Sequence, residues 1–190
     1  LEPRAIQEDE TRNVFGFFGQ VNPYKGIDIL LEALRSMTKE ERKQVLVEIH
    51  GANIEAQSGE FQTKIKKLAK KLIAEGCLRW VGPYRPDEQR NRLQEVDWVV
   101  VPSIWWENSP MVIQEAFTAG RPLIVSNIGG MAEKVDDGVN GLHFSARMPQ
   151  SLAKVMLNAT SKTLWMELSE NIEAPISYAD CAVEHLNFFN

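Results

Sequence analysis

The sequence has few residues of the kinds that build covalent or metal-stabilised folds, with only two cysteines and three histidines among 190 residues. Cys77 and Cys181 lie far apart and have no histidine cluster at ligand spacing, which argues against a disulfide framework or a zinc site. No apolar run approaches the roughly 20 residues that a membrane-spanning helix needs. The formal net charge of −5 gives no general attraction to nucleic acid or anionic membranes. We therefore expect a reduced, cytoplasmic protein.

The remaining composition is that of a globular domain. Hydrophobic residues make up 44% of the chain and charged residues 25%, and there are five tryptophans. A chain of this length can bury a sizeable core within one compact domain. Residues 1–13, LEPRAIQEDETRN, form a polar, unpatterned lead that we interpret as a linker.

One basic tract, KIKKLAKK at residues 64–71, departs from the acidic balance. Phe61, Ile65, Leu68 and Leu72 recur at helical spacing, so the lysines should occupy the opposite, solvated face. An anionic surface or acceptor is the alternative partner for this face.

Short apolar runs alternate with amphipathic stretches along most of the chain. The predicted strands cover 14–19, 45–51, 77–82, 97–103, 122–126 and 141–145. The predicted helices cover 27–37, 61–74, 86–96, 109–119, 131–135, 151–160, 162–172 and 177–189. This rhythm implies parallel strands joined by right-handed crossovers, with helices on both faces of the sheet. The predicted fold is α/β, a doubly wound parallel sheet.

The chain becomes helical towards its carboxyl terminus, and Pro175 separates the last two helical segments. Six apolar side chains there should bury against the sheet or against an absent partner domain. They are Trp165, Leu168, Ile172, Ala182, Leu186 and Phe189.

Turn-forming and polar residues follow each of the first five predicted strands. They lie at 20–26, 50–53, 82–84, 103–110 and 126–130. Ligands of doubly wound sheets bind beyond the carboxyl ends of the strands, where a phosphorylated ligand can be held. The sequence has no G-x-x-x-x-G-K-[ST] and no G-x-G-x-x-G motif, and no cluster of metal-ligating residues. Phosphate would therefore be met by Lys25 and by the free amides of the 109–119 helix.

The stretch ENSPMVIQE places Glu107 just before a predicted helix and Glu115 about two turns inside it. Asn108 or Ser109 is suited to cap the helix, and Pro110 is tolerated in its first turn. Paired carboxylates with few cations nearby suit a polyol, because sugar hydroxyls donate hydrogen bonds that carboxylates accept. The alternative is that both glutamates are only capping and surface charges.

Other residues near this edge have two interpretations each. Trp105 and Trp106 could stack on a sugar or form a hydrophobic wall. The sequence shows no carboxylate partner for any of its three histidines, His50, His143 and His185. We interpret them as structural or surface residues. This interpretation is weakest for His50, because it adjoins Gly51.

Three segments carry a resemblance to a known family. They are GQVNPYKGIDILLEAL, VGPYRPDEQRNRLQEVDWVVVPS and ENSPMVIQEAFTAGRPLIVSNIGGMAEKVDDGVNGLHF. Together, over roughly residues 14–157, they resemble the carboxyl-terminal, donor-binding half of a group 1 (family 4) retaining glycosyltransferase of the GT-B fold. The resemblance implies a Rossmann-like, nucleotide-sugar-binding domain over 14–160, with the helices of 161–190 packing on it or on an amino-terminal domain.

The resemblance implies a role for each matching residue. Glu107 would contact the hydroxyls of the donor sugar and Lys25 the pyrophosphate, which makes these two the candidate catalytic residues. Glu115 would hold the ribose hydroxyls. The remaining donor-binding positions are Gln20, Gly51, Tyr84, Arg85, Asn108, Ser109, Pro110 and Met111.

One position departs from the family pattern. Family members commonly carry an arginine directly after the glycine of the first strand, where this sequence has Gln20. A glutamine can donate a hydrogen bond to phosphate but supplies no charge. Donor binding should therefore depend more on Lys25, on helix amides, or on another arginine such as Arg85.

The resemblance implies transfer of a hexose-type sugar from a nucleoside diphosphate to an acceptor hydroxyl, with no cofactor and no metal. The partners would be the nucleotide sugar and an amino-terminal acceptor-binding domain of the same polypeptide, and no nucleic acid. This chain alone should bind nucleotide weakly and transfer nothing. Peripheral contact of the full enzyme with the inner face of a membrane is left open. The alternatives are half of a GT-B sugar-nucleotide epimerase and a non-catalytic nucleotide-binding module.

Overall fold

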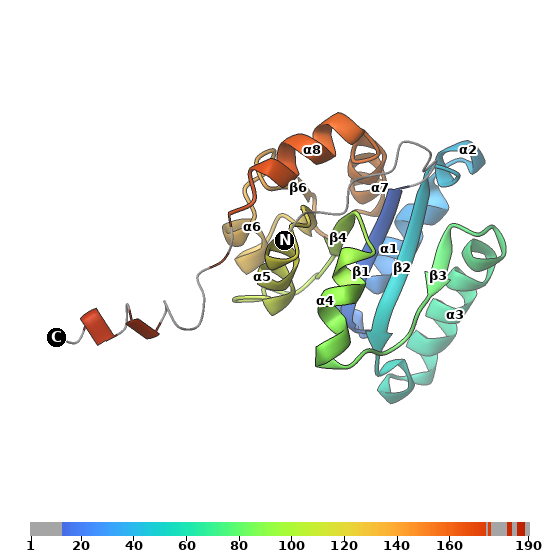
Figure 1. Cartoon of the computed structure of the whole chain (residues 1–190). Helices are drawn as coiled ribbons and strands as arrows, with labels where there is room; N and C mark the ends of the chain where they lie inside the picture. Colours follow the sequence, from blue (N-terminus) through green and yellow to red (C-terminus); the bar gives the residue numbers. More distant parts are fainter. Residues whose placement is uncertain (1–12, 174, 176–181, 184–185, 189–190) are drawn as a thin grey trace.

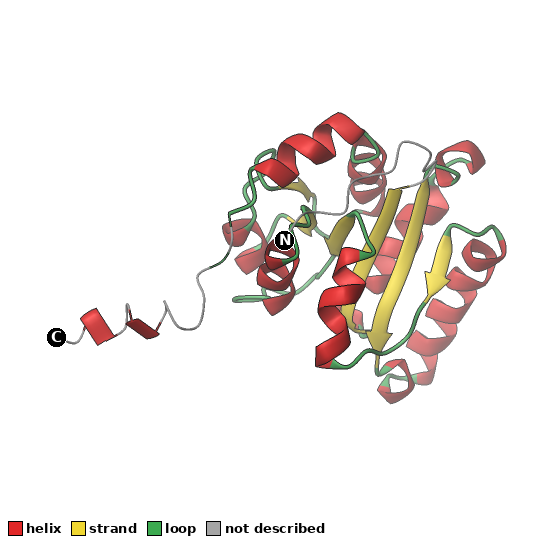
Figure 2. Cartoon of the chain, in the orientation of Figure 1, coloured by secondary structure: helices red, strands yellow, loops and turns green. Residues whose placement is uncertain are grey.

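The computed structural model describes residues 13–173, 175, 182–183 and 186–188. A single sheet of six parallel strands, ordered β3-β2-β1-β4-β5-β6, forms its centre (Figure 2). The strands are β1 Asn13–Gln20, β2 Val45–Ala52, β3 Leu78–Trp80, β4 Trp98–Val101, β5 Leu123–Ser126 and β6 Gly141–Phe144. The predicted doubly wound α/β fold is therefore confirmed.

Strand β1 lies inside the sheet and pairs with β2 along its whole length, from Asn13 opposite Val45 to Gln20 opposite Ala52. On its other side β1 pairs with β4, where Phe15 lies opposite Trp98. Each of the six strands runs in the same direction, so their carboxyl ends lie along one edge, which we call the carboxyl edge. The chain order reverses between β1 and β4, the position at which doubly wound sheets bind ligands.

Successive side chains of a strand point to opposite faces of the sheet, so the strands contribute to one hydrophobic core on each face. Phe15 and Phe17 of β1 join the first core, while Phe18 joins the second. In the same way Trp98 and Val100 of β4 point to the first core, and Val99 and Val101 to the second.

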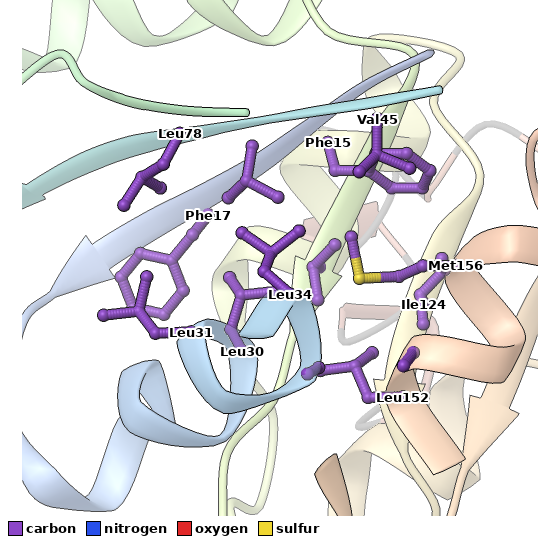
Figure 3. Close-up of a cluster of buried hydrophobic side chains, with 14 of the residues drawn as sticks. Phe15, Phe17, Leu30, Leu31, Leu34, Val45, Leu78, Ile124, Leu152 and Met156 are labelled. Carbon is purple, nitrogen blue, oxygen red and sulfur yellow. The ribbon is translucent and has the colours of Figure 1, made fainter. Parts of the chain in front are cut away.

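Helices cover both cores (Figure 1). The first core receives apolar residues of α1 Ile27–Ser36, α3 Gly59–Ala74, α7 Pro149–Asn158 and α8 Lys162–Glu170. The second receives those of α4 Pro86–Gln94, α5 Met111–Thr118 and α6 Gly129–Lys134. Figure 3 shows Leu30, Leu31 and Leu34 of α1 packed among the side chains of the strands and of α7. No helix in the described part of the chain is long and apolar enough to cross a membrane.

Three short elements were not predicted because their sequences carry little apolar periodicity. They are the 3-10 helices η1 Pro23–Lys25 and η2 Ile54–Ala56, and the helix α2 Lys39–Arg42.

The carboxyl-terminal predictions divide into two groups. Trp165 and Leu168 are buried as expected, and the Trp165 indole donates a hydrogen bond to the Asp97 carbonyl at 2.8 Å. Leu186, which is 65% exposed, and Ala182 are not buried against the sheet, and burial against a partner domain stays a prediction for both. Some predictions fall outside the described residues, namely those on the polar lead over 1–12 and on Cys181, His185 and Phe189.

Candidate functional site

The loops after β1 and β4 pack tightly against each other at the carboxyl edge. The Ile104 amide donates to the Tyr24 carbonyl at 2.9 Å. Gly26 has a left-handed conformation with φ 68°, and a Cβ built on it would lie 1.8 Å from the Pro102 carbonyl oxygen. Only glycine fits this approach, which fixes the position of the neighbouring Lys25.

Lys25 and Glu107 meet across this contact although 82 residues separate them. The Lys25 Nζ lies 2.8 Å from the Glu107 Oε2, and the two side chains are 34% and 16% exposed. The Glu107 Oε1 accepts a hydrogen bond from the hydroxyl of Ser103, which is fully buried. The carboxylate is thus held between a cation and a buried donor.

The amino-terminal end of η1 is capped by a side chain that also reaches Gln20. The Asn22 Oδ1 accepts hydrogen bonds from the amides of Tyr24 and Lys25 at 3.0 and 3.1 Å. The Asn22 Nδ2 lies 3.4 Å from the Gln20 Oε1. Gln20 is exposed at the end of β1 and belongs to the hydrogen-bonded turn that carries Lys25.

Backbone contacts from the segment after β5 hold the chain around Glu107. The Gly130 amide donates to the Glu107 carbonyl at 2.6 Å. A Cβ on Gly130 would lie 2.0 Å from the Asn108 carbonyl oxygen, so the close approach requires glycine. The loops after β1, β4 and β5 therefore fix the Lys25–Glu107 pair together.

Helix α5 begins later than predicted. It starts at Met111, with Pro110 as its N-cap in an extended conformation and no side chain capping it. The prediction that Asn108 or Ser109 caps the helix is wrong, because Pro110 is itself extended, with φ −64° and ψ 115°, and the first helical residue is Met111. Asn108, Ser109 and Met111 are exposed at the carboxyl edge, while Pro110 is buried.

Glu115 lies in the second turn of α5 and contacts helix α4. The Gln89 Nε2 donates to the Glu115 Oε2 at 2.6 Å and lies 3.5 Å from the Tyr84 hydroxyl. Burial raises the pKa of the Glu115 carboxyl, and the Gln89 hydrogen bond partly offsets that rise. Burial and the nearby Glu115 raise the pKa of the Tyr84 hydroxyl.

Two further predicted residues have local structural partners. Arg85, which precedes α4, is exposed and forms ion pairs with Asp87 at 3.0 Å and Glu88 at 3.7 Å, so acidic neighbours already match its charge. A Cβ on Gly51 would lie 2.8 Å from the Gly19 carbonyl oxygen and 2.7 Å from a Val21 methyl group. The contact between β1 and β2 is thus a sufficient reason for glycine at Gly51.

The interpretation of His50 as lacking a carboxylate partner is wrong. Its Nε2 lies 3.1 Å from the Glu48 Oε2, and the ring stacks on Phe18 with centroids 4.4 Å apart. Arg79 also pairs with Glu48, at 2.7 Å, and the two contacts lower the pKa of the Glu48 carboxyl. Residues two apart on a strand share a face, so the spacing of Glu48 and His50 could have predicted this pair.

Two features of the carboxyl edge stand out beside the predicted set. Trp105 and Trp106 are 60% and 70% exposed, and the Trp105 ring meets Tyr24 edge to face at 5.6 Å. Arg147, between β6 and α7, donates to the Ile104 carbonyl at 3.2 Å and adds a positive charge near the loop after β4. Arg147 carries no local motif, which is why the sequence did not indicate it.

The site consists of polar groups at the carboxyl edge, and the described residues bring no cluster of metal ligands to it. Among the residues that the structure describes, no three His, Cys, Asp or Glu side chains are grouped to hold a metal ion. Lys25 supplies positive charge, α5 directs its amino terminus at the carboxyl edge, and Glu107 and Glu115 supply hydrogen-bond acceptors. This arrangement suits a ligand that carries both phosphate and hydroxyl groups.

Comparison with known proteins matches the chain to one family over most of its length. The family described as glycosyl transferases group 1 matches residues 1–174. The chain is 34% identical over 145 residues to a lipopolysaccharide 1,2-N-acetylglucosaminetransferase of Salmonella typhimurium, covering 75% of this chain and 37% of that protein. It is 28% identical over 170 residues to a D-inositol 3-phosphate glycosyltransferase of Corynebacterium jeikeium, covering 87% of this chain and 40% of that protein.

Solved structures share the fold. Anabaena Alr3699/HepE in complex with UDP and glucose aligns with a TM-score of 0.75 at 22% identity, covering 94% of this chain and 48% of that one. The C-terminal domain of a glycosyl transferase group 1 family protein (LpcC) from Francisella tularensis aligns with a TM-score of 0.69 at 20% identity, covering 91% and 86%. The chain thus spans about two fifths of the first two curated relatives and about half of the first structure.

Proposed function

The chain belongs to the group 1 glycosyltransferases, and we propose that it is the donor-binding domain of a retaining enzyme that transfers a hexose-type sugar. The donor is a nucleoside-diphosphate sugar and the acceptor group is a hydroxyl. No metal or other cofactor takes part in the reaction. Among the structural relatives, one was solved with UDP and glucose, which supports a donor of this class.

The observation that carries the proposal is the placement of Lys25, Glu107 and Glu115 along one edge of the sheet. A nucleoside-diphosphate sugar presents sugar hydroxyls, a diphosphate and ribose hydroxyls in that order. Glu107 precedes α5 and Glu115 lies in its second turn, so the amino terminus of α5 falls between the two carboxylates. A helix amino terminus between two carboxylates suits a donor whose diphosphate lies between two sets of hydroxyl groups, which supports the proposal.

Lys25 and the α5 amides would stabilise the leaving group. Bond cleavage at the anomeric carbon transfers negative charge to the departing diphosphate. A fixed ammonium and the positive end of a helix dipole lower the energy of that charge without a metal. Gly26 and the capping residue Asn22 fix the backbone of Lys25, and Glu107 holds its ammonium before the donor arrives.

Glu107 would accept hydrogen bonds from the donor sugar. Its carboxylate is held by Lys25 and Ser103, so it needs little rearrangement to meet a sugar hydroxyl. When the donor binds, the Lys25 ammonium can contact the diphosphate and Glu107 together, because an ammonium has three donors.

Transfer needs more than this chain. The chain spans 37% and 40% of the two curated relatives compared above, so we propose that an amino-terminal domain supplies the acceptor site. The described domain alone should bind the nucleotide weakly and transfer no sugar. We further propose that the enzyme works in the cytoplasm.

Calorimetric titration of the chain with UDP, GDP and ADP and with their glucose conjugates tests the proposal. We expect saturable binding for one base, unchanged by EDTA, with about 10- to 100-fold weaker binding for Glu115→Ala, because charged hydrogen bonds to the ribose are lost. Glu167→Ala, which removes an exposed glutamate from α8, is the matched control and should bind as the wild type does. Binding that is equal in both variants, or absent for all ligands, would refute the proposal.

A further inference from the structure

The carboxylate of Glu115 is held by a residue of a different helix. Gln89 of α4 donates from Nε2 to the Glu115 Oε2 at 2.6 Å. Gln89 and Glu115 also line a groove of about 440 Å³ between α4 and α5, so the pair is open to a ligand. The hydrogen bond uses one carboxylate oxygen, and the described residues donate no hydrogen bond to the other, Oε1.

Among the residues that the structure describes, no cation is bonded to this carboxylate. The Tyr84 hydroxyl approaches Gln89 at 3.5 Å from the loop before α4. Arg92 of α4 pairs with Glu88 at 3.1 Å and lies over the Tyr84 ring at 5.7 Å, and Arg90 lines the same groove. Among the described residues the Gln89 amide is thus the hydrogen-bond donor that fixes Glu115.

We propose that Gln89 is a positioning residue for donor binding, which orients the Glu115 carboxylate and leaves Oε1 free to accept hydrogen bonds from a ribose. The inference rests on the proposed function and adds a residue to it. The proposal depends on geometry: α4 places an amide donor on one carboxylate oxygen of a residue of α5. A neutral donor aligns the carboxylate without drawing it away from the ligand, whereas a cation would compete with the ribose hydroxyls for the charge.

Loss of Gln89 should change how binding depends on pH. Burial raises the pKa of Glu115, while the Gln89 hydrogen bond lowers it. Without that hydrogen bond the pKa rises further, so the carboxyl is protonated at a higher pH and accepts hydrogen bonds less well. Affinity is full above the pKa and falls as the pH drops through it, so the decline should begin at a higher pH in Gln89→Leu than in the wild type.

The test compares Gln89→Leu, Gln89→Lys and the control Gln150→Leu, which removes an exposed amide from α7, outside the groove. The probe is whichever of UDP, GDP and ADP the wild type binds best, titrated by calorimetry between mildly acidic and neutral pH. We expect about tenfold weaker binding for Gln89→Leu, with its acid decline shifted upwards. In Gln89→Lys the acid decline should move back to a lower pH than in Gln89→Leu, because the ammonium again donates to the carboxylate, but the affinity should stay below that of the wild type because the cation competes with the ribose hydroxyls. Gln150→Leu should match the wild type.

Carbon-13 titration of the Glu115 carboxyl group gives a second readout that needs no ligand. Its pKa should be higher in Gln89→Leu than in the wild type, and lower in Gln89→Lys than in Gln89→Leu. If the wild type binds nucleotide and Gln89→Leu keeps both the affinity and the carboxyl pKa, the inference is wrong and the proposed function stands. If the wild type binds no nucleotide at all, the proposed function fails and the inference fails with it.

Discussion

Replacing Lys25 with methionine should weaken nucleoside diphosphate binding by about 10- to 100-fold, because a charge-assisted hydrogen bond contributes about 1.5–3 kcal/mol. The effect should be large because Lys25 is the one cationic residue in the 20–26 segment after β1, and Gln20, where the family resemblance implies a second cation, carries no charge. Calorimetric titration of Lys25→Met against the wild type measures the change. Binding should also become less sensitive to salt, since a screened electrostatic contact is removed.

Lys70→Met provides the matched control. Lys70 is exposed on α3, on the helix that carries the basic tract, and its removal changes the net charge equally. Thermal unfolding should show that Lys25→Met stays folded, because the partly exposed Lys25–Glu107 pair contributes no more than about 1 kcal/mol to stability. A loss of affinity in this variant then reflects lost contacts to the ligand and not unfolding. Equal affinity of Lys25→Met and Lys70→Met would show that Lys25 does not meet the diphosphate.

Replacing Gly26 with alanine should destabilise the domain by more than about 2 kcal/mol and abolish measurable nucleotide binding. The left-handed conformation alone costs about 1–2 kcal/mol for a residue with a Cβ. The new methyl group would in addition lie 1.8 Å from the Pro102 carbonyl oxygen, so the loops after β1 and β4 must separate. Lys25 then leaves its position beside Glu107. Urea denaturation and calorimetry measure the two effects.

Gly138→Ala separates the clash from the conformational strain. Gly138 also has a positive φ, of 75°, but a Cβ there would meet no atom within 4 Å. This variant should therefore lose only about 1–2 kcal/mol and should bind nucleotide as the wild type does. If the two alanine variants are destabilised equally, the contact between Gly26 and Pro102 is not what positions the site.

The sequence predicts the sheet well because the relevant signals are local. Runs such as Trp98–Val101 are apolar on both faces, which is typical of a central parallel strand, and the described structure buries all four residues. The spacing of Glu107 and Glu115 likewise predicts two carboxylates near one helix. The start of α5 was missed by two residues because Pro110 is extended and is itself the N-cap, which the local capping preferences of Asn108 and Ser109 do not indicate.

Contacts between distant segments could not be predicted from local patterns. The pairing of Lys25 with Glu107 depends on β1 and β4 being neighbours in the sheet, and the pairing of Gln89 with Glu115 depends on how α4 packs beside α5. The sequence indicated which residues are chemically suited to the site. The strand order determines which of them meet.

The most direct measurement of the central claim is a map of amide chemical shifts as the preferred nucleoside diphosphate is added to the isotope-labelled chain. Binding at the carboxyl edge predicts the largest changes at Lys25, at Asn108 to Met111 and at Glu115, with little change along α3 and α8. Changes concentrated on α3 or α8, or no change at saturating nucleotide, would contradict the placement of the donor between Lys25 and the two glutamates.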